Sequence, residues 1–512
     1  MSPLMLLSII LIYFSVLLGI AFYTSRNSSN ESFFIGNRNS KWWLVAFGMV
    51  GTSLSGMTFI SVPGTVGLKG FDYFQVVIGY WLGYFAVAFI LLPLYYRLKL
   101  TSIYTYLQGR LGETSYKTGA LFFILSRTLG ATLRLYLVIK VLEKFVLEAM
   151  GIPFELTAII ILVLILLYTY KGGVKTIVWT DTLQTTCMLL ALIICVGYIL
   201  HSLNFSVADG WQAMAGKGYT NLWQTDALKG NFFMKQLLGG AFITISMTGL
   251  DQEMMQKNIS VSNLKDSRKN MLTLSFLQVF VVFVFLMLGG LLYLYGMSKG
   301  GAFTHVMVNG KDTVQFLLDG KNIIGDDIFP VLALQYMPPV ISIIFIIGLI
   351  SALFPSADGA LTALTSSFCI DILGIRRKEG MTEQQQKRTR LIVHYTFAVV
   401  FLICVFYFRM VDNGSLIQTL LVVAGYTYGP LLALFAFGII TKRNVNSSLV
   451  PVICIAAPAL CYMLKQNDSK LLGGYVIGNE LLIINATFTF LLLLLTSKKG
   501  NNTNTIINEG SN

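Results

Sequence analysis

The chain has 512 residues, of which 55% are hydrophobic and 12% are charged, and its mean hydropathy is +0.71. The charged share is about half that of ordinary soluble domains, which excludes a soluble globular protein as the class. The net charge of +13 lies in short segments between apolar runs rather than on one soluble face. We therefore expect a lipid bilayer around the chain, and no nucleic acid as a partner.

Apolar runs of the length of a transmembrane helix, about 20 residues, follow one another along nearly the whole chain. They predict an all-α polytopic membrane protein with about thirteen transmembrane helices. The predicted helices span residues 4–23, 42–68, 71–97, 118–147, 155–171, 174–201, 233–256, 271–296, 337–372, 389–410, 415–440, 447–465 and 478–496. Segment 337–372 is longer than one untilted span requires, so part of it is expected to extend beyond the bilayer.

These helices are predicted to form one transmembrane domain over residues 1–497, followed by a disordered cytoplasmic tail over 498–512. Segment 4–23 lacks a basic start and a cleavage site, so we expect a retained helix rather than a signal peptide. Lys and Arg divide unevenly between the loops of the two sides, about 23 against about 7. The richer side is assigned to the cytoplasm, with the N-terminus outside and the C-terminus inside, in a plasma (bacterial inner) membrane.

The second predicted helix contains small and hydroxyl residues from Gly51 to Thr58, followed by Pro63 and Gly64. Helix breakers within apolar spans mark binding sites in transporters, and an unwound turn frees backbone carbonyls that suit sodium. Small residues also serve close helix–helix contact, so a purely structural role is the alternative interpretation.

Two further predicted helices carry acids. Asp358 lies within the ninth helix, on a face that Ser356 and Thr362 make rich in oxygen atoms. Because a carboxylate in mid-span is costly, Asp358 indicates either a transport pathway or a structural acid that is protonated or paired with Arg. Asp181 opens the sixth helix, where an isolated acid is typical of a helix start at the membrane interface.

Arg127 and Arg134 lie seven residues apart on one face of the fourth predicted helix. A buried Arg within a span faces a cavity or a partner. It can bind an anionic solute through two hydrogen bonds, pair with Asp358, or extend to the cytoplasmic surface. We favour a structural role for Arg127, and both roles stay open for Arg134.

Several other patterns exclude further classes of site. The six cysteines all lie in apolar segments without a CxxC pair, so we expect no disulfide and no transition-metal site. The three histidines form no HExxH motif, and the chain has no Gly-x-Ser-x-Gly motif. An enzyme is therefore not expected, and no cofactor beyond a coupling sodium ion is predicted.

Taken together, ordered segments resemble the sodium/solute symporter family, whose members include sodium/proline, sodium/sialic acid and sodium/glucose carriers. The resembling segments are Phe33–Arg38 before Trp42-Trp43, Ser55-Gly56 with Pro63-Gly64, Gly172-Gly173 with Trp179-Thr180-Asp181 and Leu183-Gln184, Asp251-Gln252 with Gln256, and Gly429-Pro430-Leu431-Leu432 with Thr441-Lys442-Arg443. The resemblance implies two five-helix repeats of opposite topology, 42–201 and 233–440. One extra helix (4–23) would precede them and two (447–496) would follow. It also implies sodium-coupled symport of a small polar organic solute by alternating access.

The resemblance also implies site residues. The main sodium site would use the carbonyls of Gly51, Leu54 and Ala352 and the hydroxyl of Ser356. Many members have two adjacent hydroxyl residues there, whereas Pro355 precedes Ser356 in this chain. Asp181 matches an acid at or near a second sodium site, and Asp358 falls where those members have a serine. Two such carboxylates close together would favour a bound sodium ion or one shared proton.

Ser53, Ser55, Thr58 and Gln75 fall where family members contact substrate. Proline-type and sugar-type members place aromatic residues before the Asp251-Gln252 pair, whereas this chain has Met247 and its neighbours there. The resemblance therefore favours a small polar solute, and we hypothesise a carboxylate held by Arg134. The alternatives are a proton-coupled or uncoupled carrier of the same fold, and a transporter-like membrane sensor.

Overall fold

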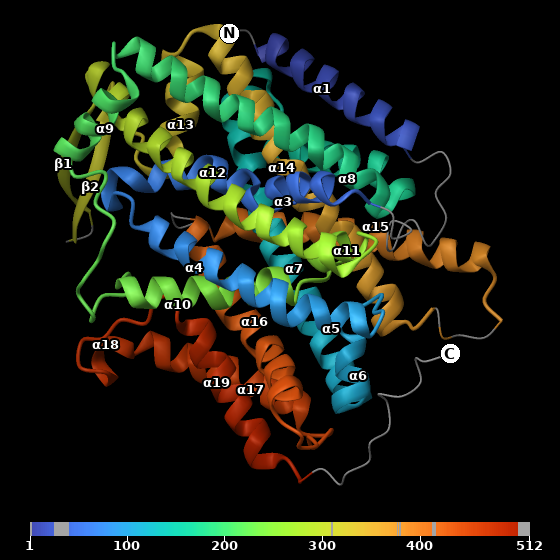
Figure 1. Cartoon of the computed structure of the whole chain (residues 1–512). Coiled ribbons are helices and arrows are strands. Elements are labelled where there is room, and N and C mark those ends of the chain that lie inside the picture. Colours follow the sequence, from blue (N-terminus) through green and yellow to red (C-terminus); the bar gives the residue numbers. More distant parts are fainter. Residues whose placement is uncertain are drawn as a thin grey trace.

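The computed structural model describes residues 3–24, 40–308, 311–375, 377, 380–411 and 416–499. Within these residues the chain is helical, apart from one small sheet (Figure 1). The region of the first predicted repeat contains α3 (Trp42–Lys69), α4 (Tyr73–Ala86), α5 (Leu92–Arg97), α6 (Thr105–Leu111), α7 (Glu113–Leu142) and α8 (Phe154–Ser202). The region of the second contains α10 (Phe233–Thr244), α11 (Gln252–Ile259), α12 (Leu264–Ser298), α13 (Ile328–Val331), α14 (Pro339–Ser367), α15 (Glu383–Met410) and α16 (Leu416–Ile440).

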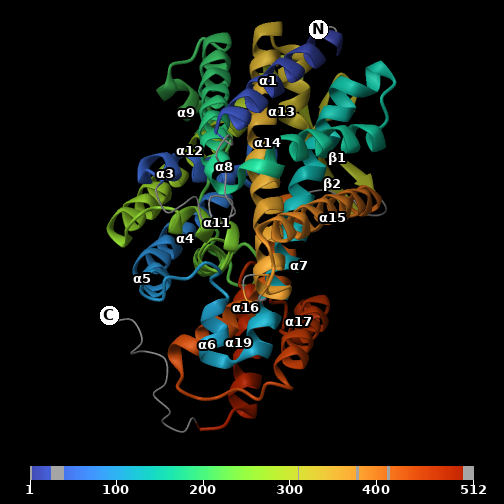
Figure 2. The same ribbon diagram turned by 90° about the vertical axis from the view of Figure 1, so that its right-hand side faces the viewer.

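The remaining elements flank this core. They are α1 (Pro3–Thr24), α9 (Val207–Gly216), α17 (Val450–Gln466), α18 (Asp468–Leu471) and α19 (Leu481–Thr496), with strands β1 (Ala302–Val308), β2 (Lys311–Leu318) and β3 (Lys321–Asn322). Helix α1 packs along α8, whereas α17 and α19 pack against α16 at the other edge of the molecule (Figure 2). The strands form an antiparallel sheet of order β1-β2-β3, so the expectation of a purely helical chain was wrong at this one place. This exception is a loop hairpin outside the helices.

By length and hydropathy, nine helices in the described part of the chain can cross a membrane, and three shorter apolar helices accompany them. Segments 155–171 and 174–201 follow one another within α8 without an intervening loop, and the apolar helices on either side of the glycines are Phe154–Thr169 and Thr176–Ser202. Segment 233–256 is instead divided, because α10 passes through the π-helix Ile245–Gly249 and stops before α11. The segment Phe33–Arg38, and the predicted tail beyond Lys499, lie outside the described residues.

The core helices pair in the way that an inverted repeat predicts. Helix α3, first in one repeat, packs along α12, and α10, the corresponding helix of the other repeat, packs along α4. In the same way α7 packs against α16, and α14 packs against α8. Exchanging the two repeats converts the α3–α12 pair into the α10–α4 pair, and the α7–α16 pair into the α14–α8 pair. The pairing therefore agrees with two repeats of opposite topology.

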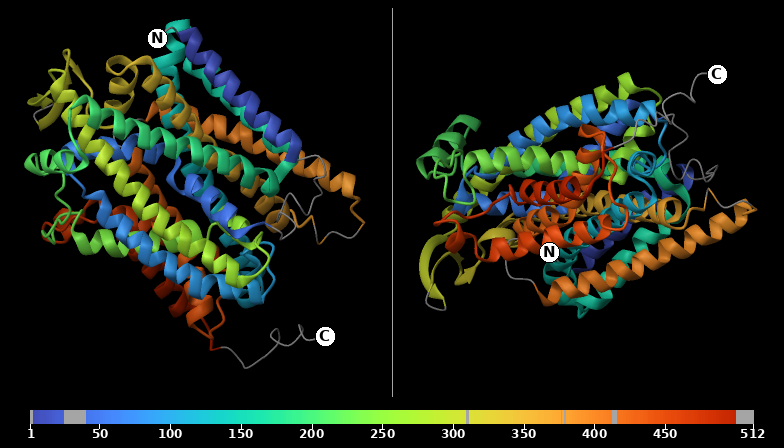
Figure 3. Two further views of the ribbon diagram at one scale, coloured as in Figure 1. Left: turned by 45° about the horizontal axis from the view of Figure 1, so that its top comes forward. Right: turned by 90° about the horizontal axis from the view of Figure 1, so that it is seen from below.

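The loops separate to the two ends of the helices. In Figure 1, α9 and the strands lie at one end, while α5 and α6 lie at the opposite end. A rotated view shows the same separation (Figure 3). Helix α9 and strands β1–β3 belong to the loops predicted to be poor in Lys and Arg, whereas α6 belongs to the rich set. The predicted division of loops therefore corresponds to a physical division in the structure.

Helices α4 and α10 touch through their backbones. A Cβ atom added to Gly79 would lie 2.2 Å from the Leu237 carbonyl oxygen, and one added to Gly240 would lie 2.2 Å from that of Val76. Such close approach needs glycine on both helices, which is the usual device of helix packing in membranes.

We expect Gly240→Ala to destabilise the protein by about 1–3 kcal/mol, because the added methyl group forces the two backbones apart. Thermal unfolding of the purified variant measures this change. Gly197→Ala in α8 is the matched control, since a Cβ atom there meets nothing within 4 Å. An equal effect of the two substitutions would contradict close backbone packing as the cause.

Candidate functional site

The first feature of the site is a break in α3. Ser55 adopts φ 51° and ψ 169°, far from helical values, although the helix resumes directly after it. A non-glycine residue at positive φ is strained, and such strain persists where the surroundings enforce it. The break interrupts the regular i to i+4 ladder, so the carbonyls just before Ser55 lose their usual donors. The sequence prediction of an unwound turn in this helix is confirmed.

A second break lies between α10 and α11. Asp251 has extended backbone and caps α11, because its carboxylate accepts hydrogen bonds from the N–H groups of Glu253 (2.9 Å) and Met254 (3.2 Å). The Tyr428 hydroxyl donates to the same carboxylate at 3.1 Å. The sequence signal for this break is Gly249 followed two residues later by an N-capping acid, which the continuous helix predicted for 233–256 overlooked.

A cavity lies between the two breaks. Its volume is about 80 Å³, several times the roughly 10–15 Å³ that one water molecule needs. Five of the six residues predicted to contact substrate line it, namely Ser53, Ser55, Thr58, Arg134 and Met247. The sixth, Gln75, lies elsewhere: its side chain bonds Asp72, and its oxygen accepts from the Gln224 N–H at 3.3 Å. Gln75 therefore fixes a loop beside α4 and is not part of the cavity wall.

The cavity also has residues that the sequence did not single out. Three tyrosines of α4 line it, and their spacing places them on one helix face: Tyr73, Tyr80 and Tyr84. The Tyr73 and Tyr80 hydroxyls lie 3.3 Å apart, and Tyr84 donates to Gln278 of α12. Their regular spacing was the available signal, although a tyrosine stripe is also typical of ordinary packing.

Arg134 lines this cavity without forming an ion pair to any acid in the described part of the chain. Its side chain is buried, and its Nε has no hydrogen-bond acceptor among the described residues. Arg127, two turns earlier on α7, differs in this respect, because it forms an ion pair with Glu253 and its Nε lies 3.8 Å from Asp251. The structural role that we favoured for Arg127 therefore agrees with its contacts. A buried guanidinium such as that of Arg134 is costly unless a ligand compensates its charge.

The residues predicted for the main sodium site lie on two helices that meet at the first break. All four, Gly51, Leu54, Ala352 and Ser356, are buried. A Cβ atom added to Gly56 would lie 3.8 Å from the Leu353 Cα, so the break in α3 contacts α14 next to Ala352. The Ser356 hydroxyl donates to the Leu353 carbonyl at 2.9 Å, which leaves its lone pairs available to a cation.

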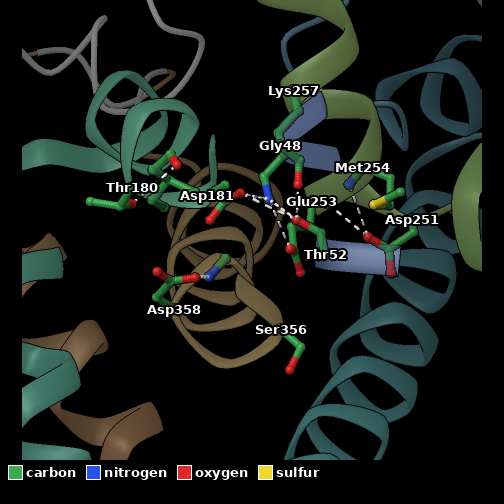
Figure 4. Close-up of polar contacts among 12 residues, drawn as sticks. Gly48, Thr52, Thr180, Asp181, Asp251, Glu253, Met254, Lys257, Ser356 and Asp358 are labelled. Carbon is green, nitrogen blue, oxygen red and sulfur yellow. Dashed lines mark hydrogen bonds and ion pairs between the residues drawn. The ribbon is translucent and has the colours of Figure 1, made fainter. Parts of the chain in front are cut away.

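Asp181 forms an ion pair with Lys257, a residue that the sequence pattern placed in a cytoplasmic loop. Lys257 is one of the basic residues behind the predicted cytoplasmic total of about 23, yet its side chain is only 3% exposed and its ammonium lies 2.7 Å from Asp181 Oδ2. The same ammonium donates to the Thr52 hydroxyl at 2.7 Å and to Glu253 at 3.4 Å. Figure 4 shows these three oxygen-bearing groups converging on Lys257. The error arose because α11 continues to Ile259, beyond the predicted helix end.

Asp358 forms a separate set of contacts. The Tyr168 hydroxyl of α8 donates to its Oδ2 at 2.8 Å, and the Gly359 N–H donates to its Oδ1. Its carboxylate is fully buried, and these hydrogen-bond donors are different from those of Asp181. Part of the oxygen-rich face of α14 serves packing, since Thr365 contacts His394 at 2.9 Å.

Two broken helices that face each other across a central cavity, within an inverted repeat, define a secondary transporter. Comparison with known proteins specifies the family. The family model described as "Sodium:solute symporter family" matches residues 33–450. The chain therefore belongs to the sodium:solute symporter family: it is a multi-pass integral membrane protein that performs sodium-coupled symport by alternating access.

Individual relatives are more distant. The chain is 22% identical over 477 residues to the sodium/sialic acid symporter SiaT of Proteus mirabilis, covering 91% of each chain. It is 22% identical over 482 residues to the rabbit (Oryctolagus cuniculus) sodium/glucose cotransporter 1, covering 85% of this chain and 68% of that one. A solved structure of a sodium-coupled sialic acid symporter, substrate-bound and outward-open, has a TM-score of 0.80 at 20% identity. That comparison covers 97% of this chain and 99% of the other, and it establishes a shared fold.

Proposed function

We propose that the coupling sodium ion binds at the first break of α3, between the carbonyls of Gly51, Leu54 and Ala352 and the hydroxyl of Ser356. The single observation that carries this proposal is the non-helical backbone at Ser55, which lies against α14 beside Ala352. The four ligands are oxygen atoms, which a hard cation prefers. Because the proposed ligands belong to two helices, α3 and α14, binding of sodium would couple to the relative position of these helices.

Ser356→Ala is expected to raise the sodium concentration for half-maximal uptake about tenfold, since one of four ligands is lost. Uptake into proteoliposomes over a sodium titration measures this. Ser351→Ala is the matched control on the same helix, because its hydroxyl donates to Tyr13 of α1 at 2.7 Å and is not one of the proposed ligands. An unchanged sodium requirement in Ser356→Ala, or an equal change in the control, would contradict the ligand role.

We further propose that the transported solute is a small organic anion whose carboxylate binds Arg134. The support is the buried guanidinium, which has no acid partner among the described residues and lies at the wall of the cavity between the breaks. Ser53, Ser55 and Thr58 would bind polar groups of the solute, and Met247 would contact its apolar part. The relatives named for sialic acid symport carry a sugar acid, which belongs to the same chemical class.

Thermal unfolding of the purified protein tests both proposals while the solute is still unidentified. A saturable rise of the unfolding temperature in sodium, absent in potassium at equal ionic strength, is expected from the ion site. A further rise is expected from carboxylates in a panel of small solutes, and not from their amides. A rise produced equally by the amides would contradict recognition through Arg134.

The arrangement in the membrane is also a proposal. The chain would cross the membrane thirteen times, with the N-terminus outside and the end that carries α6 in the cytoplasm. The positive-inside rule and the division of loops between the two ends support this orientation.

A further inference from the structure

The charged groups next to the cavity, of which Arg127 lines its wall, form a connected network. Arg127 of α7 pairs with Glu253, Glu253 with Lys257, and Lys257 with Asp181 of α8, so opposite charges alternate along the chain of contacts. All four side chains are at most 4% exposed. Among the described residues, Lys257 is the sole cation within ion-pair distance of Asp181. The charge of this acid is thus compensated from within the protein.

The position of the Lys257 ammonium is that of a bound cation. Three oxygen atoms from three helices surround it, and each can accept one of its three N–H bonds. Gly48 permits this arrangement, because α3 approaches so closely that a Cβ atom there would lie 3.2 Å from the Asp181 Cβ. A free sodium ion at the same oxygen atoms would lie within contact distance of the ammonium, and two like charges at that distance repel strongly.

We propose that Lys257 acts as a tethered cation that permanently occupies the Asp181 site. This transporter then binds one sodium ion, at the main site, whereas an open Asp181 site would bind a second ion. The ammonium is covalently attached, so it binds at high effective concentration and does not leave the site into solution. It also joins the two broken helices, since Thr52 belongs to α3 and Lys257 to α11. This inference rests on the sodium coupling and on the main site proposed above.

The experiment counts sodium ions bound to the purified full-length protein in lipid nanodiscs, by equilibrium binding of radioactive sodium alone. We expect one ion for the natural protein and one more for Lys257→Gln, because Asp181 then becomes a buried carboxylate without a cation. Lys257→Arg, which keeps the charge, should not gain an ion. Neither should the double variant Asp181→Asn/Lys257→Gln, which removes both charges.

The outcomes separate this inference from the main site. A natural protein that already binds two ions, or a Lys257→Gln variant that gains none, would overturn the tethered cation. A natural protein that binds no ion, with one ion gained in Lys257→Gln, would refute the main site and support the inference.

Folding of the variant gives a second measurement. If Lys257→Gln is unstable without sodium, its unfolding temperature should rise more steeply with sodium concentration than that of the natural protein. A variant that stays unfolded at every sodium concentration would overturn the inference, since sodium then cannot replace the ammonium.

Discussion

Arg134→Gln is expected to weaken the binding of carboxylate solutes by a factor on the order of 100, and to reduce their saturable uptake to match. Charge-assisted bonds between a guanidinium and a carboxylate are about twice as strong as neutral ones, and two parallel bonds form at once. Glutamine keeps a polar side chain of moderate size but loses both the charge and the planar fork. Solute-induced thermal stabilisation and uptake in proteoliposomes measure the change.

Two comparisons make this result specific. Arg134→Lys keeps the charge without the fork, and an intermediate loss is expected. The stabilisation by sodium alone should persist in Arg134→Gln, because the main sodium site that we propose is formed by α3 and α14 and does not include Arg134. Carboxylate uptake with natural affinity in Arg134→Gln would show that the guanidinium has a structural role instead.

Arg127→Gln is expected to destabilise the protein by about 3–5 kcal/mol, the typical effect of removing one partner from a buried ion pair. Glu253 and Asp251 would each lose a positive neighbour while staying buried. Thermal unfolding in detergent measures the effect.

Lys144→Gln is the matched control for that variant. It also removes a cation from an ion pair, with Asp327 at 3.0 Å, but both side chains are more than one third exposed. Exposed pairs contribute at most about 1 kcal/mol, so a small change is expected. Similar losses in the two variants would contradict a special role for the buried network.

The sequence predicted the features that are local along the chain. Apolar length predicted the helices, and the run of small residues with Ser55 and Gly56 predicted the break in α3. The resemblance to the family placed Ser53, Thr58 and Met247, and the arginine within the fourth predicted helix suggested Arg134; the structure brings these side chains to one cavity.

The partners of the charged residues could not be predicted in the same way. Lys257 has a long flexible side chain, and whether it is buried depends on where α11 ends, which sequence reasoning locates only to within about 2–4 residues. Its contact with Asp181 joins residues 76 positions apart. Gln75 fails for a different reason: it lies two residues after Tyr73, on another face of α4 from the tyrosines that line the cavity, and its side chain bonds Asp72.

The glycine contact between α4 and α10 has a consequence for how the seventh span moves. A backbone contact without intervening side chains resists sliding of one helix along the other, so we expect α4 and α10 to move together as one rigid body. Helix α11, beyond the break, is attached differently: ion pairs to α7 and α8 hold it. Ion pairs can break and re-form as water enters, whereas the close backbone packing of α4 and α10 does not depend on water in this way. We therefore expect the break at Leu250–Asp251 to separate α10, which stays with α4, from α11, whose ion pairs can be released.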